Sequence, residues 1–414
     1  MSGNPGRKKS ALSSKNFRIF LYGNTVSVLG IWIQRLALGW QAWQLSESSL
    51  VVGVVAAGQF LPFLLLTPFF GVLVDRIRPR YGAIVMHVIF MSIALTLGAL
   101  TIFDRVSIEL LVLLSFCHGV ANSAYSPFRL ALIPDLVPQD QFPSAVAISA
   151  VIFNTTRFIG PGIAGAIVTF YGLGFAYFAN SISYLPVILS LLVIRTHRKK
   201  PEPSAKKKYS EELMEGLRYT RDHPTIRKVI LVAGVSTFFG RGVLELMPAF
   251  AALIFAGGSA ELAALMAAAG AGAILTSLIF SFASLHSYLG QTVVVGALGV
   301  AASMFLFAMA ETLAFGIFAT ALLGVFSSMV SIGSQSEVQI KVDDRLRGRV
   351  LSLWTLLLIG GPAVGSIVAG WLAAEFGSTN TLLSFAIVSL ILIIAVVMQK
   401  SNTVPSRGAP ETGH

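Results

Sequence analysis

Twelve long apolar segments constrain this chain more than any other feature of its sequence. They cover approximately residues 19–43, 50–73, 82–103, 108–130, 142–170, 174–194, 228–256, 261–283, 289–309, 312–335, 348–373 and 378–399. The apolar core of a bilayer is about 30 Å thick, and a helix needs about 20 residues to cross it. Unpaired backbone groups are too costly in lipid for an open sheet. The sequence therefore predicts an all-α integral membrane protein with twelve transmembrane helices.

The distribution of charge supports this prediction and argues against a nucleic-acid partner. Only 12% of the 414 residues are charged, compared with about 25% in soluble domains. The net charge of +11 would indicate nucleic acid if the basic residues formed one folded groove. They lie instead in the connections between apolar segments, so the lipid bilayer is the expected environment and no nucleic acid is expected.

The same basic residues predict the orientation of the chain. Of the 30 Lys and Arg residues, three lie within apolar segments and only Arg105 lies in a connection on the side away from the termini. Because basic connections stay on the cytoplasmic side, both termini are predicted to be cytoplasmic. We expect a multi-pass monomer in the cell (inner) membrane.

A basic and polar stretch divides the chain in two. Its first part, "RTHRKKPEPSAKKK", indicates a flexible linker, and its second part indicates a surface helix that begins near Ser210 and stops at Pro224. The predicted organisation is a cytoplasmic tail (1–18), a six-helix bundle (19–194), a cytoplasmic linker with an amphipathic helix (195–227), a second six-helix bundle (228–399) and a second tail (400–414).

The two bundles show internal similarity. "IGPGIAGAIV" and "GGPAVGSIVAG" place Pro161 and Pro362 201 positions apart, and "IQRLAL" and "FGRGVLEL" place Arg35 and Arg241 206 positions apart. Two related halves are the simplest explanation. In membrane proteins built this way the substrate site lies between the halves, near the middle of the membrane.

The stretch "FFGVLVDRIRPRYG" contains a glycine, then Asp-Arg four residues later, then further basic residues. With the twelve segments, it makes the chain resemble the major facilitator superfamily of transporters. In that family this loop latches the inner gate, so the resemblance implies gating by Gly71, Asp75, Arg76 and Arg80. The alternative is that the arginines only fix the topology of the chain.

Further motifs resemble the drug and siderophore exporters of that superfamily, including the enterobactin-exporter-like group. They are "LPFLLLTPFFGVLVDR", "IPDLVP", "RFIGPG", "MPAF" and "RLRGRV". "RFIGPGIAG" resembles the proline-glycine motif of antiporters, while small residues at helical spacing also serve ordinary close packing. The predicted packing motif comprises Gly160, Pro161, Gly165, Gly361, Pro362 and Gly365.

Ionisable side chains within the apolar segments are the main candidates for function. A charge in lipid costs at least ~2.5 kcal/mol, so such residues are retained for a reason. Arg35, Arg157 and Arg241 share one predicted depth slightly beyond the membrane centre, where guanidinium groups would meet an anionic substrate. Glu245 follows Arg241 by one turn, and the two are the predicted proton-coupling residues: Glu245 carries the proton, and Arg241 favours its ionised form. A purely structural Arg241–Glu245 pair is the alternative.

Polar residues at helical spacing extend the predicted cavity. In addition to the three arginines, the predicted substrate-binding residues are Asn24, His118, Asn122 and Asn154. Isolated polar residues of this kind also serve as hydrogen-bonding contacts between helices. No cofactor is expected, and His87, Cys117 and His118 form no recognisable metal or nucleophile set.

The leading interpretation is a secondary active transporter, and not an enzyme. It would export small amphipathic or anionic compounds in exchange for protons, so its partners are a small-molecule substrate and protons. A nucleotide-driven pump is disfavoured because the chain has no Gly-rich phosphate loop ending in Gly-Lys-Ser/Thr. Two alternatives stay open: an uptake carrier of the same fold for a small anionic solute, and a membrane enzyme acting on lipid-linked substrates.

Overall fold

The structure is a computed structural model that describes residues 10–74, 77–194, 209–282 and 288–399. Its described residues form helices and short connections without a strand. The first group of long helices is α1 (Lys15–Ser46), α2 (Ser49–Val74), α3 (Pro79–Ile102), α4 (Ile108–Leu136), α5 (Phe142–Tyr171) and α6 (Leu173–Val193). Short turns η1 (Ala11–Ser13) and η2 (Gln139–Gln141) precede α1 and α5.

The second group follows the linker helix α7 (Tyr209–Asp222). It comprises α8 (Pro224–Ser236), η3 (Thr237–Arg241), α9 (Gly242–Glu245), α10 (Met247–Phe255), α11 (Ser259–Phe282), α12 (Leu289–Ala308), α13 (Leu313–Lys341), α14 (Asp344–Phe376) and α15 (Ser378–Met398). Ten of these helices across both groups are long and apolar enough to cross a membrane, and α8 to α10 form an eleventh, bent span. The 32-residue α1, which packs along α5 and α6, completes twelve.

Local sequence explains where several helices begin and end. The side chains of Ser14, Ser107 and Thr312 accept hydrogen bonds from backbone N–H groups in the first turns of α1, α4 and α13. Gly172 and Gly377 both adopt φ near +85°, a conformation that other residues rarely take. They form equivalent corners, because each joins the fifth span of its half to the sixth.

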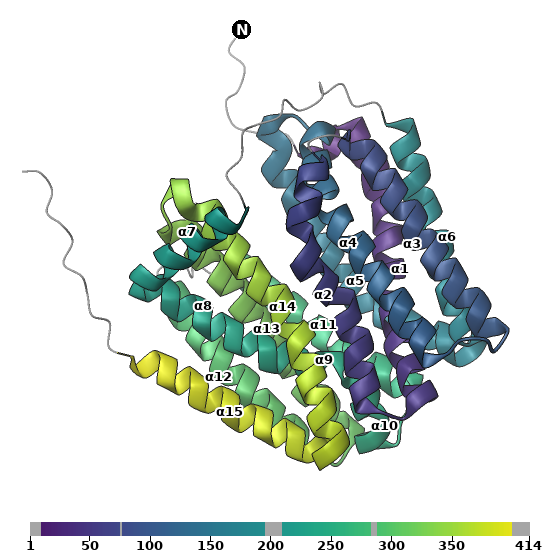
Figure 1. Ribbon diagram of the computed structural model, residues 1–414, viewed down its shortest axis with the longest axis vertical. Coiled ribbons are helices and arrows are strands. Elements are labelled where there is room, and N and C mark those ends of the chain that lie inside the picture. The colour runs from purple at the N-terminus through teal and green to yellow at the C-terminus, as the bar shows by residue number, and fades with distance from the viewer. Residues whose placement is uncertain (1–9, 75–76, 195–208, 283–287, 400–414) are drawn as a thin grey trace, which may run out of the picture.

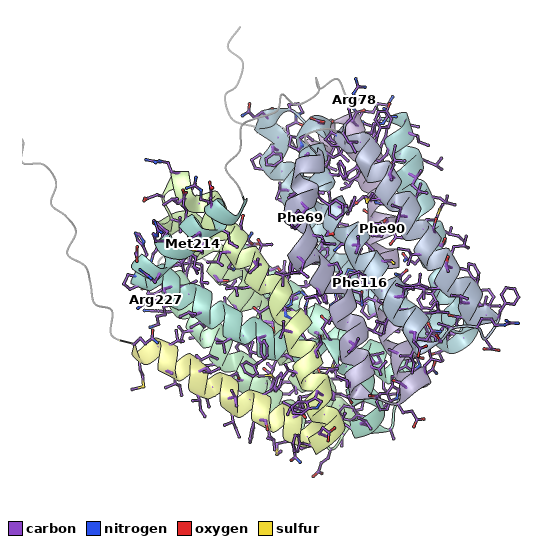
Figure 2. The ribbon with its side chains drawn as sticks, in the orientation of Figure 1. Phe69, Arg78, Phe90, Phe116, Met214 and Arg227 are labelled. Carbon is purple, nitrogen blue, oxygen red and sulfur yellow. The ribbon has the colours of Figure 1, made fainter. Side chains whose placement is uncertain are left out.

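Two six-span halves are therefore present, α1–α6 and α8–α15. Figure 1 shows them as a purple-to-blue group and a green-to-yellow group that lie close together near α10 and diverge toward the end that carries α7. We call the diverging end the basic end, since Arg78 and Arg227 lie there (Figure 2). The other end is called the α10 end.

The halves contact each other along two seams, α2 with α14 and α5 with α11. In the first seam the Ser366 hydroxyl donates a hydrogen bond to the carbonyl oxygen of Gly53 at 3.1 Å. In the second, the hydroxyls of Thr169 and Ser259 are 2.9 Å apart. These contacts lie toward the α10 end, so the described structure is closed at that end.

The seventh span differs from the single helix expected over 228–256. A π-helical turn at Thr237–Arg241 interrupts it, and the chain bends by 60° between Glu245 and Met247. Pro248 lies in the first turn of α10, where its missing N–H removes no helical hydrogen bond. The expectation of one continuous helix was wrong because the proline starts a new helix after the bend.

Candidate functional site

A small cavity is lined by all four of the ionisable residues that were predicted from their place within the apolar segments. Arg35 comes from α1, Arg157 from α5, Arg241 from the end of η3 and Glu245 from α9. The cavity has a volume of about 50 Å³ and lies between the two halves. We call this cavity the arginine pocket.

Glu245 forms an ion pair with Arg35 of the opposite half. Its side chain is only 9% exposed and that of Arg35 is 22% exposed, so the pair is largely shielded from solvent. The alternative of an Arg241–Glu245 pair was wrong, because no hydrogen bond or ion pair joins those two side chains in the described structure. The approach of α1 provides Glu245 with an arginine that the sequence spacing did not reveal.

The other two arginines lack an anionic partner. Within the described residues neither Arg157 nor Arg241 has a hydrogen-bond or ion-pair partner. The guanidinium carbon of Arg157 lies 5.9 Å from the ring centre of Trp32, and that of Arg35 lies 5.3 Å from the same ring. The ring centre of Phe60 lies 5.1 Å from the guanidinium carbon of Arg35. Aromatic faces stabilise the cations without neutralising them, so the pocket keeps an excess of positive charge.

A larger cavity of about 470 Å³ adjoins the arginine pocket and shares Arg35 with it. Its lining includes the predicted residues Asn24, His118 and Asn122, together with Tyr125 and Arg129 from the same face of α4. The helical spacing of these α4 residues in the sequence therefore does place them on one cavity wall. We call this space the central cavity.

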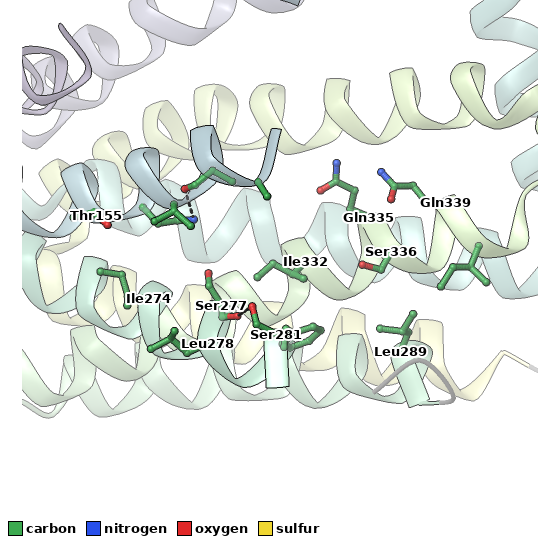
Figure 3. Close-up of a pocket in the computed structure, with 16 residues that line it drawn as sticks. Thr155, Ile274, Ser277, Leu278, Ser281, Leu289, Ile332, Gln335, Ser336 and Gln339 are labelled. Atoms are coloured by element: carbon green, nitrogen blue, oxygen red, sulfur yellow. Dashed lines mark hydrogen bonds between the residues drawn. The ribbon is translucent and has the colours of Figure 1, made fainter. Parts of the chain in front are cut away.

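Asn154 lies elsewhere, in a third cavity of about 840 Å³ between the basic-end parts of α5, α11 and α13. Figure 3 shows its uncharged lining, including Thr155, Ser277, Ser281 and Gln335. The Asn154 amide donates to the carbonyl of Ala150 in its own helix at 3.0 Å. The structure therefore separates Asn154 from the arginine pocket, although Arg157 is only three residues away.

Of the four predicted gate residues, Gly71 and Arg80 are described by the structure and lie at the basic end. Gly71 is in the last turn of α2, and Asp75 and Arg76 lie outside the described residues. Arg80 donates hydrogen bonds to the carbonyls of Leu191 and Leu192, at 2.5 and 2.7 Å, at the end of α6. These contacts stay within the first half, and the gating role remains a prediction.

The predicted packing motif occupies close helix crossings. Gly160 lies against Trp32 of α1, while Gly361 and Gly365 lie against η3. The fifth span thus packs on the first span of its half as the eleventh packs on the seventh. Gly165 lies against Ala263 in the α5–α11 seam. Pro161 lines the arginine pocket, and Pro362 lies inside α14.

Several residues near these cavities were not predicted from the sequence. Trp32 and Phe60 flank the arginines, and His87 and Tyr184 line the central cavity. Trp32 lies one turn before Arg35, so helical spacing was an available signal. Glu337, 2% exposed, forms an ion pair with Lys341 at 2.6 Å and was also missed, although it lies in an apolar helix.

Comparison with known proteins identifies the family. The profile of a family described as transmembrane secretion effector, a branch of the major facilitator superfamily, matches residues 8–411. The chain belongs to the major facilitator superfamily. As a member it is a multi-pass membrane transporter that moves small molecules, and it is not an enzyme.

Two relatives and one solved structure illustrate the similarity. The chain is 24% identical to the staphyloferrin A transporter of Staphylococcus aureus (strain NCTC 8325 / PS 47), over 88% of this chain and 91% of that protein. It is 23% identical to the enterobactin exporter EntS of Escherichia coli O157:H7 (strain EC4115 / EHEC), over 96% of each. The solved structure is that of a bacterial homologue of the human lysosomal transporter Spinster, in an inward-facing and unoccupied conformation. It has the same fold, with a TM-score of 0.69 and 15% sequence identity, over 92% of this chain and 96% of that one.

Proposed function

We propose that this transporter exports small anionic or amphipathic compounds across the cell (inner) membrane in exchange for protons. It works as a monomer by alternating access, with both termini and the basic end in the cytoplasm. The basic residues at that end support this orientation. In this orientation the described structure, closed at the α10 end, faces inward.

The observation that carries the proposal is the excess of positive charge in the arginine pocket. Three guanidinium groups and one carboxylate line it, and Arg157 and Arg241 have no anionic partner among the described residues. A charge with no partner is costly in a shielded site. An anion such as a carboxylate would offset that cost and accept paired hydrogen bonds from a guanidinium. The names of the siderophore-transporting relatives are consistent with such a substrate.

The Arg35–Glu245 pair gives the proposal a route for proton coupling. It joins α1 of the first half to α9 of the second, so it must be broken or rearranged when the halves rock. A substrate anion breaks it by taking Glu245's place on Arg35, and a proton breaks it by neutralising Glu245. The protein exchanges substrate for protons if the anion breaks the pair in one half of the transport cycle and the proton breaks it in the other half.

The same pair also favours a second candidate, an uptake carrier. A proton on Glu245 releases Arg35 for an anion, and an anion on Arg35 favours protonation of Glu245 by the reciprocity of linked binding. A proton and an anion would then travel together into the cell. The direction of proton movement therefore separates the two candidates.

Vesicles of known orientation test both candidates. Inside-out vesicles with an acidic interior should accumulate radiolabelled staphyloferrin A or enterobactin, and a protonophore should abolish the accumulation. Right-side-out vesicles that accumulate the same compounds from an acidic exterior would show uptake instead. Movement that ignores the proton gradient in both orientations would refute proton coupling.

A further inference from the structure

The central cavity has a wall of five aromatic rings that the proposed anion site does not use. His87 and Phe90 come from α3, His118 and Tyr125 from α4, and Tyr184 from α6. The His87 ring centre is 4.8 Å from that of Tyr125, and the Phe90 ring centre is 4.9 Å from that of His118. Phe90 also stacks on Tyr184, with ring centres 5.8 Å apart. We call these five residues the ring wall.

The charges around the ring wall argue against a cationic ligand. Boxes of aromatic rings often bind cations through their electron-rich faces. Here, however, the central cavity is lined by Arg35 and Arg129, and its lining in the described structure includes no Asp or Glu. A ligand that enters it is therefore repelled if it is cationic and attracted if it carries negative charge.

The two histidines add hydrogen-bond acceptors to the wall. His87 is 2% exposed, and its Nδ1–H donates to the carbonyl of Ala83 at 2.7 Å. Its Nε2 is therefore the acceptor of the neutral ring. The Nδ1 of His118 is buried and has no partner among the described residues. A neutral imidazole keeps one acceptor nitrogen, so each of the two histidines can accept a hydrogen bond from a ligand hydroxyl.

We propose that the ring wall is a subsite for an aromatic group, and that the substrate is an aromatic acid whose anionic group binds in the arginine pocket. This inference rests on the anionic substrate of the proposed function and specifies its class. Arg35 lines both spaces, so one molecule can contact both subsites. The aromatic group stacks on the ring wall, and a hydroxyl on it donates to a histidine nitrogen.

The ring wall belongs entirely to the first half of the molecule. In the described structure the second half contributes only Thr355 and Ile359 to the central cavity. The arginine pocket, in contrast, draws residues from both halves. The aromatic group therefore stays with one half while the anionic group lies at the boundary that rearranges.

Calorimetric titration of the purified full-length chain in detergent tests this subsite. The probes are naphthoate, its saturated analogue decalin carboxylate, and trimethyl(naphthyl)ammonium, each corrected by titration into protein-free micelles. Naphthoate should bind about tenfold more tightly than decalin carboxylate, because favourable ring contacts are worth about that factor. The ammonium probe should show no binding above the micelle background.

Variants of the chain test which residues cause the preference for naphthoate. Tyr125→Leu should remove the preference for naphthoate and leave the affinity for decalin carboxylate unchanged, while Tyr171→Leu, at an exposed position, should change neither. Arg157→Gln should weaken both acids by the same factor. If Tyr125→Leu lowers the melting temperature strongly, His118→Leu provides the same comparison.

The contrary results separate the aromatic subsite from the anion site. Equal affinity for the two acids would overturn the aromatic subsite and leave the anion site intact. A preference for the ammonium probe over both acids would overturn the subsite and the anionic substrate together. Failure of the chain to bind either acid would also overturn both.

Discussion

The first span of each half occupies the same place in its bundle, yet the two are built differently. In the first half α1 is one helix of 32 residues that carries Arg35. In the second half the corresponding span contains a π-helical turn ending at Arg241, then Glu245, then a bend of 60°. Each span contributes an arginine to the arginine pocket, but only the second contributes a carboxylate. Structural symmetry thus coexists with a division of roles: the first half presents two cations and the aromatic rings, and the second presents one cation and the group that can take up a proton.

Removing that carboxylate should have the largest effect. Glu245→Gln leaves Arg35 without its anionic partner and removes the predicted proton carrier. We expect complete loss of gradient-driven accumulation in vesicles and a loss of stability of about 3–5 kcal/mol, the usual cost of breaking a buried pair. Glu375→Gln, at an exposed position on α14, is the matched control and should keep full accumulation and full stability. Full proton-driven transport by Glu245→Gln would exclude this residue as the carrier.

Removing a cation from the first half should have the next largest effect. Arg157→Gln eliminates one of the two guanidinium groups that have no partner in the described structure. A charge-assisted hydrogen bond is worth about 1.5–3 kcal/mol, so anion affinity should fall by about 10- to 100-fold. Arg157→Lys keeps the charge but lacks the planar guanidinium group, so its anion affinity should lie between those of the wild type and Arg157→Gln. Arg105→Gln, in an exposed connection, should bind anions normally when titrated alongside.

A change in the seam between the halves should affect conformation more than affinity. A side chain at Gly53 would meet the backbone oxygen of Ser366, so Gly53→Leu should push α2 and α14 apart at the α10 end. Spin labels at Glu47 and Glu375, in a Cys117→Ser background, should report a longer distance by pulsed spin resonance. Gly162→Leu faces open space and should leave that distance unchanged. An unchanged distance in Gly53→Leu would show that the seam accommodates the leucine locally, without separation of α2 and α14.

The smallest effect is expected where α7 contacts the second half. Glu215 on α7 forms an ion pair with Arg349 on α14, and both side chains are partly exposed. Exposed pairs contribute little, so a double-mutant cycle with Glu215→Gln and Arg349→Gln should give a coupling free energy of about 0.2–1 kcal/mol in denaturant unfolding. Transport should persist in both single variants. A coupling well above this range would indicate that α7 stabilises the second half more than its exposure suggests.

Much of the fold was predictable because lipid imposes simple requirements on a sequence. Segment length, backbone pairing and loop charge are local properties, and they predicted the helical membrane fold and its twelve spans. The bend after Glu245 was missed because Pro248 is compatible with either a kink or a new helix. The boundaries of the predicted domains, the gate and the orientation of the termini remain predictions.

The candidate site was predictable in depth but not in pairing. Counting residues along each helix placed Arg35, Arg157 and Arg241 at one level, and all three line one cavity. Which arginine pairs with Glu245 depends on how the two halves approach, and no spacing within one helix contains that information. Asn154 illustrates the same limit, because its neighbourhood is set by α11 and α13 rather than by its own helix.

The π-helical turn at Thr237–Arg241 and the short helix α9 that follows it fix the direction in which Glu245 points. A π-helical turn closes i→i+5 hydrogen bonds and so holds one residue more than an α-helical turn, which lets it absorb a deletion by becoming α-helical. Helix α9 has no such reserve, and an α-helix advances about 100° per residue. A residue added or removed between Gly242 and Glu245 would therefore turn Glu245 away from Arg35, although every side chain involved would still be present. Among homologous sequences, we expect gaps to be tolerated in the connection after α6 and absent between residues 242 and 245.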